Sequence, residues 1–500
     1  MTATATIEPH TGRTGWLHRL RLYAQRIVLV LLALLIGALG MRAWMSRSTP
    51  DLQPWHRLVP EELDARALDA ADWSQYVAAE NHLFADVARD MEHAVAPDER
   101  AHFNRYNPDS PVYPERFATR WNRSHVLEPE AAAVGVVVLL HGLTDSPYSM
   151  RHLAEDYRRR GFIALVPRLP AHGTVPGALT RIEWQDWTAA TRMAMREAAR
   201  RSHGSLPVHL VGYSNGGALA VKYALDALEN PALPQVERLV LLSPMIGVNR
   251  SARYAGIAGW PAILPPFART AWLDILPEFN PFKYNSFPVN AARQSYLLTD
   301  AVQRQLLRLK ASGDLARLPP VLTFQSLVDA TVIASAVATA FYAHLPANGS
   351  ALVLFDINRE ANLEPFLRQG ALVAPSAMLG AAPRNYGVTI VTNAGPRTLE
   401  IVARTTAAGA SQEIIRPLNL RYPADVFSLS HIALPFPESD GLYGRTPDPA
   451  ENFGVALGTL GMRGERGVMA GGLDITTVRL GSNPFFAYVI ERTAAAASAD

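Results

Sequence analysis

The chain has 500 residues, of which 49% are hydrophobic and 18% are charged, so it can bury a large core. Its formal net charge of +2 argues against a nucleic acid as its main partner. It contains no cysteine, which excludes disulfides, cysteine nucleophiles and thiolate metal sites.

An apolar run lies close to the N-terminus. Residues 27–41 are uninterrupted apolar residues, and several arginines precede them. As a helix this run covers about 22 Å, short of a hydrocarbon core of roughly 30 Å, but a helix over residues 27–45 spans it if Arg42 snorkels. Because basic flanks stay inside, we predict a basic segment (1–26), a single-pass inner-membrane anchor (27–45) and an exported, periplasmic remainder. The alternative is a cleaved signal segment with its site at residues 38–40, which leaves a secreted or periplasmic protein.

Residues 46–118 are polar and only patchily helical in composition. We expect them to form a stalk or a packing arm without a catalytic role. An edge strand is predicted within residues 118–127, because apolar and polar residues alternate there.

From residue 134 onward, short apolar runs alternate with helical stretches. The predicted strands cover residues 134–140, 162–166, 208–211, 238–242, 319–325 and 351–355. The predicted helices cover residues 148–160, 184–201, 218–228 and 333–344. This alternation predicts an α/β fold, in which a mostly parallel sheet carries helices on both faces and the active site lies at the carboxyl ends of the strands.

We predict a catalytic domain over residues 119–437. Two segments within it and one after it interrupt the alternation of strands and helices. Residues 246–318 are rich in proline and aromatic residues, and we expect a cap that lines an apolar substrate pocket; the alternative is a helical insertion with its own core. Residues 357–424 form an insertion with a hairpin expected at 387–392 and 398–404. The extension 438–500 is expected to hold a last strand at 475–480 and a disordered tail from residue 494.

A G-x-S-x-G pattern occupies residues 212–216. It follows a buried-strand pattern and precedes a helical one, which is the context of a nucleophile elbow with Ser214 at its tip. Gly212 and Gly216 are expected because side chains at these two positions would collide in so sharp a turn.

A serine nucleophile needs a general base and an acid that orients it, and in this architecture the chain order is serine, acid, histidine. Only His344 and His431 of the 14 histidines follow Ser214. His344 ends a predicted helix, so elimination favours His431 as the base. Asp329 follows a predicted strand and is favoured as the acid over Asp356, although a helix N-cap would also suit it.

The oxyanion donors are expected to be backbone N–H groups of Asn215 and Leu143. Leu143 follows His141 and Gly142, and Gly142 lets this turn approach the nucleophile closely. We expect His141 to orient the turn, with a second base as the alternative. His203 and His209 have no carboxylate at ligand spacing, so the sequence predicts no metal site.

These residues together resemble the α/β-hydrolase superfamily, and most closely its branch of monoacylglycerol lipases, bacterial carboxylesterases and S33-type serine aminopeptidases. The matching segments are residues 139–142, 170–173, 184–187, 212–217 and 325–329, within a resemblance that spans about 120–345. The resemblance implies an α/β-hydrolase fold and a cofactor-free ester hydrolase with Ser214, Asp329 and His431 as its triad. In the family the histidine follows the last core strand directly, whereas here that strand, residues 351–355, is followed by the 357–424 insertion.

The leading hypothesis is therefore a serine esterase or lipase-like hydrolase that acts on a small-molecule or lipid ester through an acyl-enzyme. A peptidase or an acyltransferase with the same triad is an alternative, because fold and triad do not fix the acyl acceptor. A non-catalytic binding protein on this fold is the alternative from another class. The sequence leaves the oligomeric state open.

Overall fold

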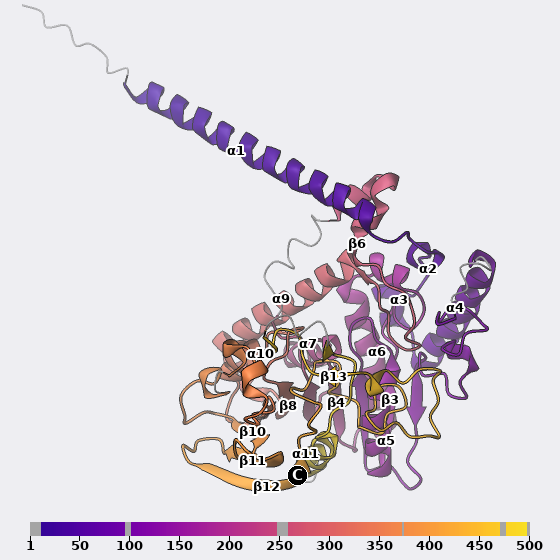
Figure 1. The fold of residues 1–500 in the computed structure, drawn as a ribbon, viewed down its shortest axis with the longest axis vertical. Helices are drawn as coiled ribbons and strands as arrows, with labels where there is room; N and C mark the ends of the chain where they lie inside the picture. The colour runs from indigo at the N-terminus through magenta and orange to yellow at the C-terminus, as the bar shows by residue number, and fades with distance from the viewer. Residues whose placement is uncertain (1–11, 96–101, 248–258, 373–374, 471–476, 498–500) are drawn as a thin grey trace, which may run out of the picture.

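Ten strands form one continuous sheet in the computed structural model, which describes residues 12–95, 102–247, 259–372, 375–470 and 477–497 (Figure 1). Their order across the sheet is β1-β3-β2-β4-β5-β8-β9-β10-β11-β12. The strands are β1 (His125–Leu127), β2 (Gly135–Leu140), β3 (Phe162–Val166), β4 (Val208–Tyr213), β5 (Arg238–Leu242), β8 (Val321–Ser326), β9 (Ala351–Phe355), β10 (Gly387–Asn393), β11 (Glu400–Thr406) and β12 (Glu413–Arg421). Neighbours from β3 to β10 are parallel, and β1, β11 and β12 are antiparallel additions at the two edges.

Helices cover both faces of the sheet, because successive residues of each buried strand point to opposite sides. On β2, Val136 and Val138 pack into one hydrophobic cluster, whereas Val137 and Leu139 pack into another. The first cluster also holds side chains of α6 (Trp184–Ser202), α7 (Asn215–Glu229) and α9 (Val289–Ser312). The second holds side chains of α5 (Arg151–Arg159) and α11 (Phe486–Ala497). The predicted α/β architecture is confirmed.

The region expected as a cap is divided between two roles. Helix α9 buries Leu298, Val302 and Leu306 in the same cluster as α7, so it belongs to the helical layer, and the prediction of a cap over all of 246–318 is wrong. The elements that remain outside the layer are η7 (Trp260–Ile263), η8 (Pro265–Ala271) and a small hairpin of β6 (Trp272–Asp274) and β7 (Phe287–Pro288). From here on, these elements are called the cap. Residues 248–258 lie outside the described part of the chain.

The 357–424 insertion extends the central sheet. Strand β10 pairs in parallel with β9, and β10 and β11 form an antiparallel hairpin over the region where one was expected. The interpretation of residues 351–355 as the last core strand is therefore wrong. Strand β10 is part of the core because Val388 and Val391 bury in the clusters on opposite faces of the sheet.

The segment expected as a stalk or packing arm contains α2 (Pro54–Arg57), α3 (Ala65–Ala70) and α4 (Trp73–Ala94). It packs on the sheet domain, where Leu68 and Tyr76 share a buried cluster with Met193 of α6. Buried Arg168 makes ion pairs with Glu62 (2.9 Å) and with Glu80 (3.1 Å). The arm therefore supplies the countercharges for a buried cation of the loop that follows β3.

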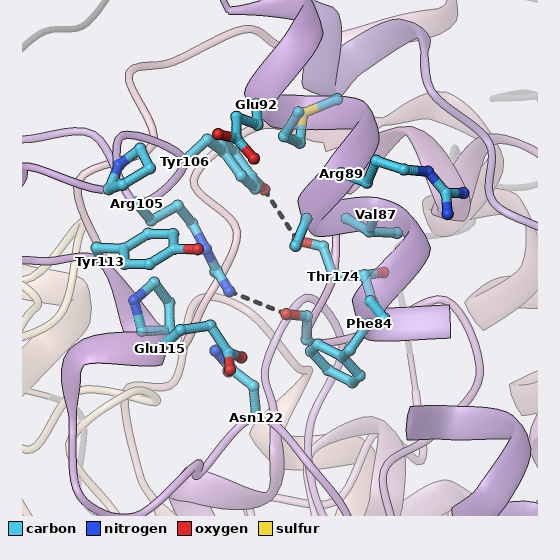
Figure 2. A pocket seen from close by; sticks show the side chains of 16 residues that line it. Phe84, Val87, Arg89, Glu92, Arg105, Tyr106, Tyr113, Glu115, Asn122 and Thr174 are labelled. Atoms are coloured by element: carbon cyan, nitrogen blue, oxygen red, sulfur yellow. Dashed lines mark hydrogen bonds between the residues drawn. The ribbon is translucent and has the colours of Figure 1, made fainter. Parts of the chain in front are cut away.

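A cavity of about 330 Å³ lies between α4 and the segment before β1 (Figure 2). Buried Arg105 crosses it and donates to the carbonyl oxygen of Gly173 at 3.1 Å, and the Tyr106 hydroxyl donates to that of Thr174 at 3.1 Å. Both bonds brace the loop after β3 from the side of the arm.

The C-terminal extension also belongs to the main body. Helix α11 packs on the second face of the sheet and runs through Ala497. The expected disordered tail from residue 494 is therefore wrong for residues 494–497, because the helix that buries Phe486 and Val489 continues into them. Residues 475–480, expected as a strand, contribute β14 (Thr477–Val478), which pairs with β13 (Met462–Arg463), and residues 475–476 lie outside the described part.

Helix α1 (Gly12–Met45) leaves the rest of the molecule as a long projecting helix (Figure 1). Among the described residues it is the one helix that is long and apolar enough to cross a membrane, judged by length and composition alone. A signal sequence passes the same test, so this finding leaves the anchor and the cleaved signal as alternatives.

Candidate active site

The predicted nucleophile lies on a strained turn between β4 and α7. Ser214 has φ of 55° and ψ of −115°, a conformation that L-residues rarely adopt. The strain is held by hydrogen bonds on both sides: the Ser214 N–H donates to the Leu242 carbonyl (2.9 Å), and the Ser214 carbonyl accepts from Met245 N–H (2.9 Å). The turn thus fixes the hydroxyl at the carboxyl end of the sheet.

The two pattern glycines are required by close backbone contacts. A Cβ at Gly212 would lie 2.3 Å from the Gly216 carbonyl oxygen, and a Cβ at Gly216 would lie 2.2 Å from the Leu140 carbonyl oxygen. Neither backbone atom can move aside as a flexible side chain would. Helix α7 therefore approaches β2 and β4 as closely as the sequence pattern predicted.

The three predicted triad residues form one hydrogen-bonded chain. The Nε2 atom of His431 lies 3.0 Å from Ser214 Oγ, and its Nδ1 atom lies 2.7 Å from Asp329 Oδ2. Because a carboxylate only accepts, Nδ1 carries the proton and Nε2 is left to accept from the serine hydroxyl. All three side chains are buried, so this arrangement has the geometry of a serine, a base and an orienting acid.

Asp329 is held in its charged form. Burial on its own would raise the pKa of Asp329, but the attraction and hydrogen bond of His431 and the N–H groups of Val332 and Thr331 outweigh it and lower the pKa. Those two N–H groups donate to Oδ1 at 3.0 and 2.8 Å, which leaves Oδ2 to accept from His431. The N-cap alternative for Asp329 is wrong, because α10 (Ala334–Ala336) begins only after Ile333; Oδ1 of Asp329 instead holds the turn that precedes this helix.

The two competing candidates lie elsewhere. The Nδ1 atom of half-buried His344 lies 2.9 Å from Nζ of Lys310 on α9. The carboxylate of Asp356 is ion-paired with Arg359 at 2.6 Å and accepts from the Thr392 hydroxyl at 2.9 Å.

The predicted oxyanion turn lies beside Ser214. A Cβ at Gly142 would be 3.2 Å from the Cβ of Ser214, so this turn and the elbow are in contact. Within the described part of the chain, the N–H groups of Leu143 and Asn215 donate to no protein acceptor. Two N–H groups of this kind close to a serine are the donors that an oxyanion site needs.

His141 ties this turn to the loop after β3. Its Nε2 accepts from the Leu169 N–H (3.0 Å), so its Nδ1 carries the proton and donates to the Gly142 carbonyl (2.9 Å). Burial, with a smaller contribution from His172, holds the pKa of His141 well below its ordinary value. Both ring nitrogens are occupied, so the geometry favours the orienting role over the role of a second base.

Sequence reasoning missed Lys283, which comes from the segment between β6 and β7. Its Nζ donates to the Thr144 hydroxyl (2.9 Å) and to the Leu143 carbonyl (3.2 Å), which fixes the predicted oxyanion turn from the cap side. Burial lowers the pKa of Lys283, and the charge of Asp145 opposes this. A lysine in a proline-rich segment carries no signal of such a contact.

Sequence reasoning also missed a contribution of the C-terminal extension. The fully buried Glu465 accepts from the backbone N–H of His431 through Oε2 (2.9 Å) and pairs with Arg479 (2.5 Å). Arg479 reaches Thr331, next to the acid. The loop that carries the predicted base is therefore held by residues outside the resemblance.

A cavity of about 320 Å³ opens above the serine. Its lining combines the elbow, the oxyanion turn, the base and the cap: Gly142, Leu143, Thr144, Tyr213, Ser214, Met245, Lys283, Phe287, Ala292, Ser295, Thr331, His431, Ile432 and Arg479. Of the described aromatic residues between 246 and 318, Phe287 alone lines it. Another aromatic residue of this region lies in the core instead: Phe282 stacks on Tyr148 with ring centres 4.0 Å apart. Among the described residues, no group of three or more histidine or acidic side chains is placed to hold a metal ion.

The parallel sheet with a strand–serine–helix turn at its carboxyl edge defines an α/β-hydrolase. Residues 131–341 match the sequence model of a family described as serine aminopeptidase, S33. The fold is therefore that of an α/β-hydrolase, and the residues that match the family model make up less than half of this chain.

Two curated relatives each match a part of the chain. The thermostable monoacylglycerol lipase of Bacillus sp. (strain H-257) is 36% identical over 95 residues, which are 19% of this chain and 36% of the relative. Phospholipase YtpA of Bacillus subtilis (strain 168) is 28% identical over 117 residues, which are 23% of this chain and 42% of the relative. The chain thus matches less than half the length of either.

Among solved structures, that of LipS and LipT, two metagenome-derived lipolytic enzymes, is 23% identical with a TM-score of 0.38, over 47% of this chain and 88% of the other. That of a soluble variant of monoglyceride lipase from Saccharomyces cerevisiae is 13% identical with a TM-score of 0.36, over 46% and 81%.

Proposed function

We propose that the protein hydrolyses carboxylic acyl esters through an acyl-enzyme on Ser214. The observation that carries the proposal is the buried chain of contacts from Ser214 Oγ to His431 (3.0 Å) and from His431 to Asp329 (2.7 Å). The lipase and phospholipase relatives support esters of lipids as the substrate class.

In the first step His431 Nε2 takes the proton of Ser214 as Oγ attacks the ester carbonyl. The imidazolium that forms is stabilised by Asp329, whose pKa is lowered in the folded chain, so the carboxylate stays charged. The N–H groups of Leu143 and Asn215 are assigned to the oxyanion. Collapse of the tetrahedral intermediate expels the alcohol, which receives its proton from His431.

In the second step the same groups activate water. His431 Nε2 takes a proton from a water molecule as it attacks the acyl carbonyl, and the collapse returns a proton to Ser214 and releases the acid. Release of the acid restores the starting hydrogen bonds.

A fluorophosphonate probe tests the activated serine. We expect the wild-type protein to be labelled and Ser214→Ala to remain unlabelled, while Ser312→Ala, an exposed serine at the end of α9, labels as the wild type does. A folded wild-type protein that takes no label would refute the proposal and favour a non-catalytic binding protein.

The acyl acceptor needs a separate comparison, because a peptidase or acyltransferase would also label. Matched p-nitrophenyl esters and aminoacyl p-nitroanilides, each with and without an added alcohol acceptor, separate the three activities. We expect ester cleavage to dominate and the released acid, not a new ester, to be the product.

We further propose that residues 27–45 anchor the protein in the inner membrane, with the catalytic domain on the exported side. The apolar length of α1 and the arginines before it support this orientation. N-terminal sequencing of the mature protein tests it: a start within residues 1–26 is expected, and a start after Gly40 would establish cleavage.

A further inference from the structure

Exposed apolar side chains gather over residues 263–276, in the segment that precedes the β6–β7 hairpin and in the hairpin itself. Ile263 is 81% exposed and Leu264 is 56% exposed, and Leu273 and Leu276 are also exposed. Residues 260–268 contain no charged side chain. An exposed apolar patch of this kind on a folded protein marks a surface that contacts a membrane or another protein.

This segment packs against the C-terminal end of α1 (Figure 1, the short pink helices beside it). An apolar groove separates the two and is lined by Ile36, Leu39, Gly40, Ala43, Trp44, Arg47, Pro261, Leu264 and Phe267. Arg42 donates to the carbonyl oxygens of Thr270 and Trp272, both at 3.2 Å.

A second arginine reinforces the contact from the opposite side. Arg269 donates to the carbonyl oxygens of Arg47 (3.2 Å) and Thr49 (2.9 Å) and pairs with Asp51. Arg42 thus bonds α1 to the end of η8 and the start of β6, and Arg269 bonds η8 to the residues directly after α1, so these hydrogen bonds fix the position of η7 and η8 along the helix.

That height places the segment at membrane depth. The contact residues 36–44 of α1 extend over about 12 Å of helix. In a span over residues 27–45 they occupy the last part of the crossing, within the leaflet nearer the catalytic domain. Whatever packs beside them lies at the same depth, and an uncharged segment with exposed isoleucine and leucine suits that position.

The same segment leads directly into the active-site cavity. Strand β6 follows η8 and pairs with β7, where Asp274 is the partner of Phe287. Phe287 lines the cavity above Ser214. One short hairpin therefore connects the apolar patch to the wall of the predicted acyl site.

We propose that residues 260–268 insert into the leaflet beside α1, so that the cap rests on the lipid bilayer and the cavity takes its substrate from that leaflet. The placement at the bilayer rests on α1 remaining attached, and the delivery of substrate rests also on the proposed esterase function. The proposal excludes cleavage at residues 38–40, because Leu39 and Gly40 form one wall of the groove.

Depth-dependent quenching tests the placement without any assay of activity. The chain has no cysteine, so Ile263→Cys in the full-length protein carries a single environment-sensitive label. In phosphatidylcholine proteoliposomes we expect quenching by spin-labelled lipid and protection from aqueous iodide. The matched control is Ile414→Cys on edge strand β12, where the side chain is 70% exposed; it should show the reverse.

The proposal is overturned if iodide quenches the label at residue 263 as strongly as it quenches the label at residue 414. Protection from iodide without quenching by lipid also overturns it, because a protein then covers the patch. A mature chain that begins after Gly40 overturns it as well.

A pair of charge substitutions tests delivery. Ile263→Glu/Leu264→Glu should reduce kcat/KM for an ester embedded in vesicles by about tenfold and leave a soluble p-nitrophenyl ester unchanged, whereas Ile414→Glu/Ile415→Glu should change neither. An equal loss on both esters, or no loss on either, overturns delivery from the leaflet. A wild-type protein that cleaves neither ester refutes the esterase function, while the quenching result still decides the placement.

Discussion

Replacement of Glu465 by alanine tests whether the C-terminal extension holds the active site together. The carboxylate is fully buried and accepts from the His431 N–H (2.9 Å), the Arg466 N–H (2.9 Å) and Arg479 Nη2 (3.2 Å), and it forms an ion pair with Arg479 Nε at 2.5 Å. Removal of one partner of a buried ion pair costs about 3–5 kcal/mol. Because 19% of the Arg479 side chain is exposed and can be hydrated, we expect the lower end, about 3 kcal/mol.

The measurement is the urea midpoint of the full-length protein in detergent, together with kcat/KM on a soluble ester. Glu413→Ala is the matched control, since it breaks the more exposed ion pair with Arg404 on β11 and β12 and should cost less than about 1 kcal/mol. Turnover of Glu465→Ala should fall about ten- to hundredfold, because the backbone of His431 loses an acceptor and the base shifts.

The double variant Glu465→Ala/Arg479→Met should be more stable than the single variant, because it removes the cation that the alanine leaves without its carboxylate. If Glu465→Ala is no less stable than Glu413→Ala, or if the double variant is the least stable of all, the reasoning is refuted.

His431→Ala should lower kcat on a soluble ester by about 10³-fold or more with little change in KM; near-normal turnover would reassign the base. Lys283→Met should lower kcat/KM by about tenfold because the predicted oxyanion turn loses two hydrogen bonds, and Lys283→Arg should recover part of it. Gly216→Ala should yield no folded protein in a solubility assay, since its Cβ would lie 2.2 Å from a carbonyl oxygen. Burial, helped by Arg57, lowers the pKa of His56 from 6.5 to about 4, so the stability contributed by its neutral form is complete above pH 6.5 and is lost as the pH falls toward 4. The loss amounts to about 3 kcal/mol, and a scan of melting temperature against pH should flatten in this window for His56→Gln.

The elbow was predictable because its causes are local. A buried strand, two glycines and a helix lie within about twenty residues, and the contact that forbids a Cβ at Gly212 arises within that turn, although the one at Gly216 is with Leu140 of the neighbouring strand β2. Asp329 was predictable for a related reason, since it follows a strand whose apolar run marks it. His431 was predicted by elimination alone. Its position next to Asp329 depends on strands β10 to β12, which no local sequence pattern assigned to the central sheet.

The errors share one physical cause. An amphipathic pattern shows that a helix has a buried face but not what buries it, so α9 was assigned to a cap although Leu298 and Val302 pack with α7. Lys283 and Glu465 were missed because their partners are distant in sequence: the lysine bonds to residues about 140 positions earlier, and the glutamate to a residue 34 positions earlier. Single polar residues in irregular segments give no periodic signal of such contacts.

The segment that matches the hydrolase family does not contain the whole predicted triad. Residues 131–341 contain Ser214 and Asp329 but not His431. They also contain two buried arginines whose carboxylate partners lie outside: Arg168 pairs with Glu62 and Glu80 of the N-terminal arm, and Arg151 pairs with Asp440 and Glu451 of the C-terminal extension. A chain cut to the matched segment would leave both cations without countercharges, at a cost of several kcal/mol each, which is comparable with the whole stability of a typical domain. The arm and the extension are therefore structural parts of the hydrolase domain, and the chain must be kept whole from the arm to α11 for the predicted base to reach the serine.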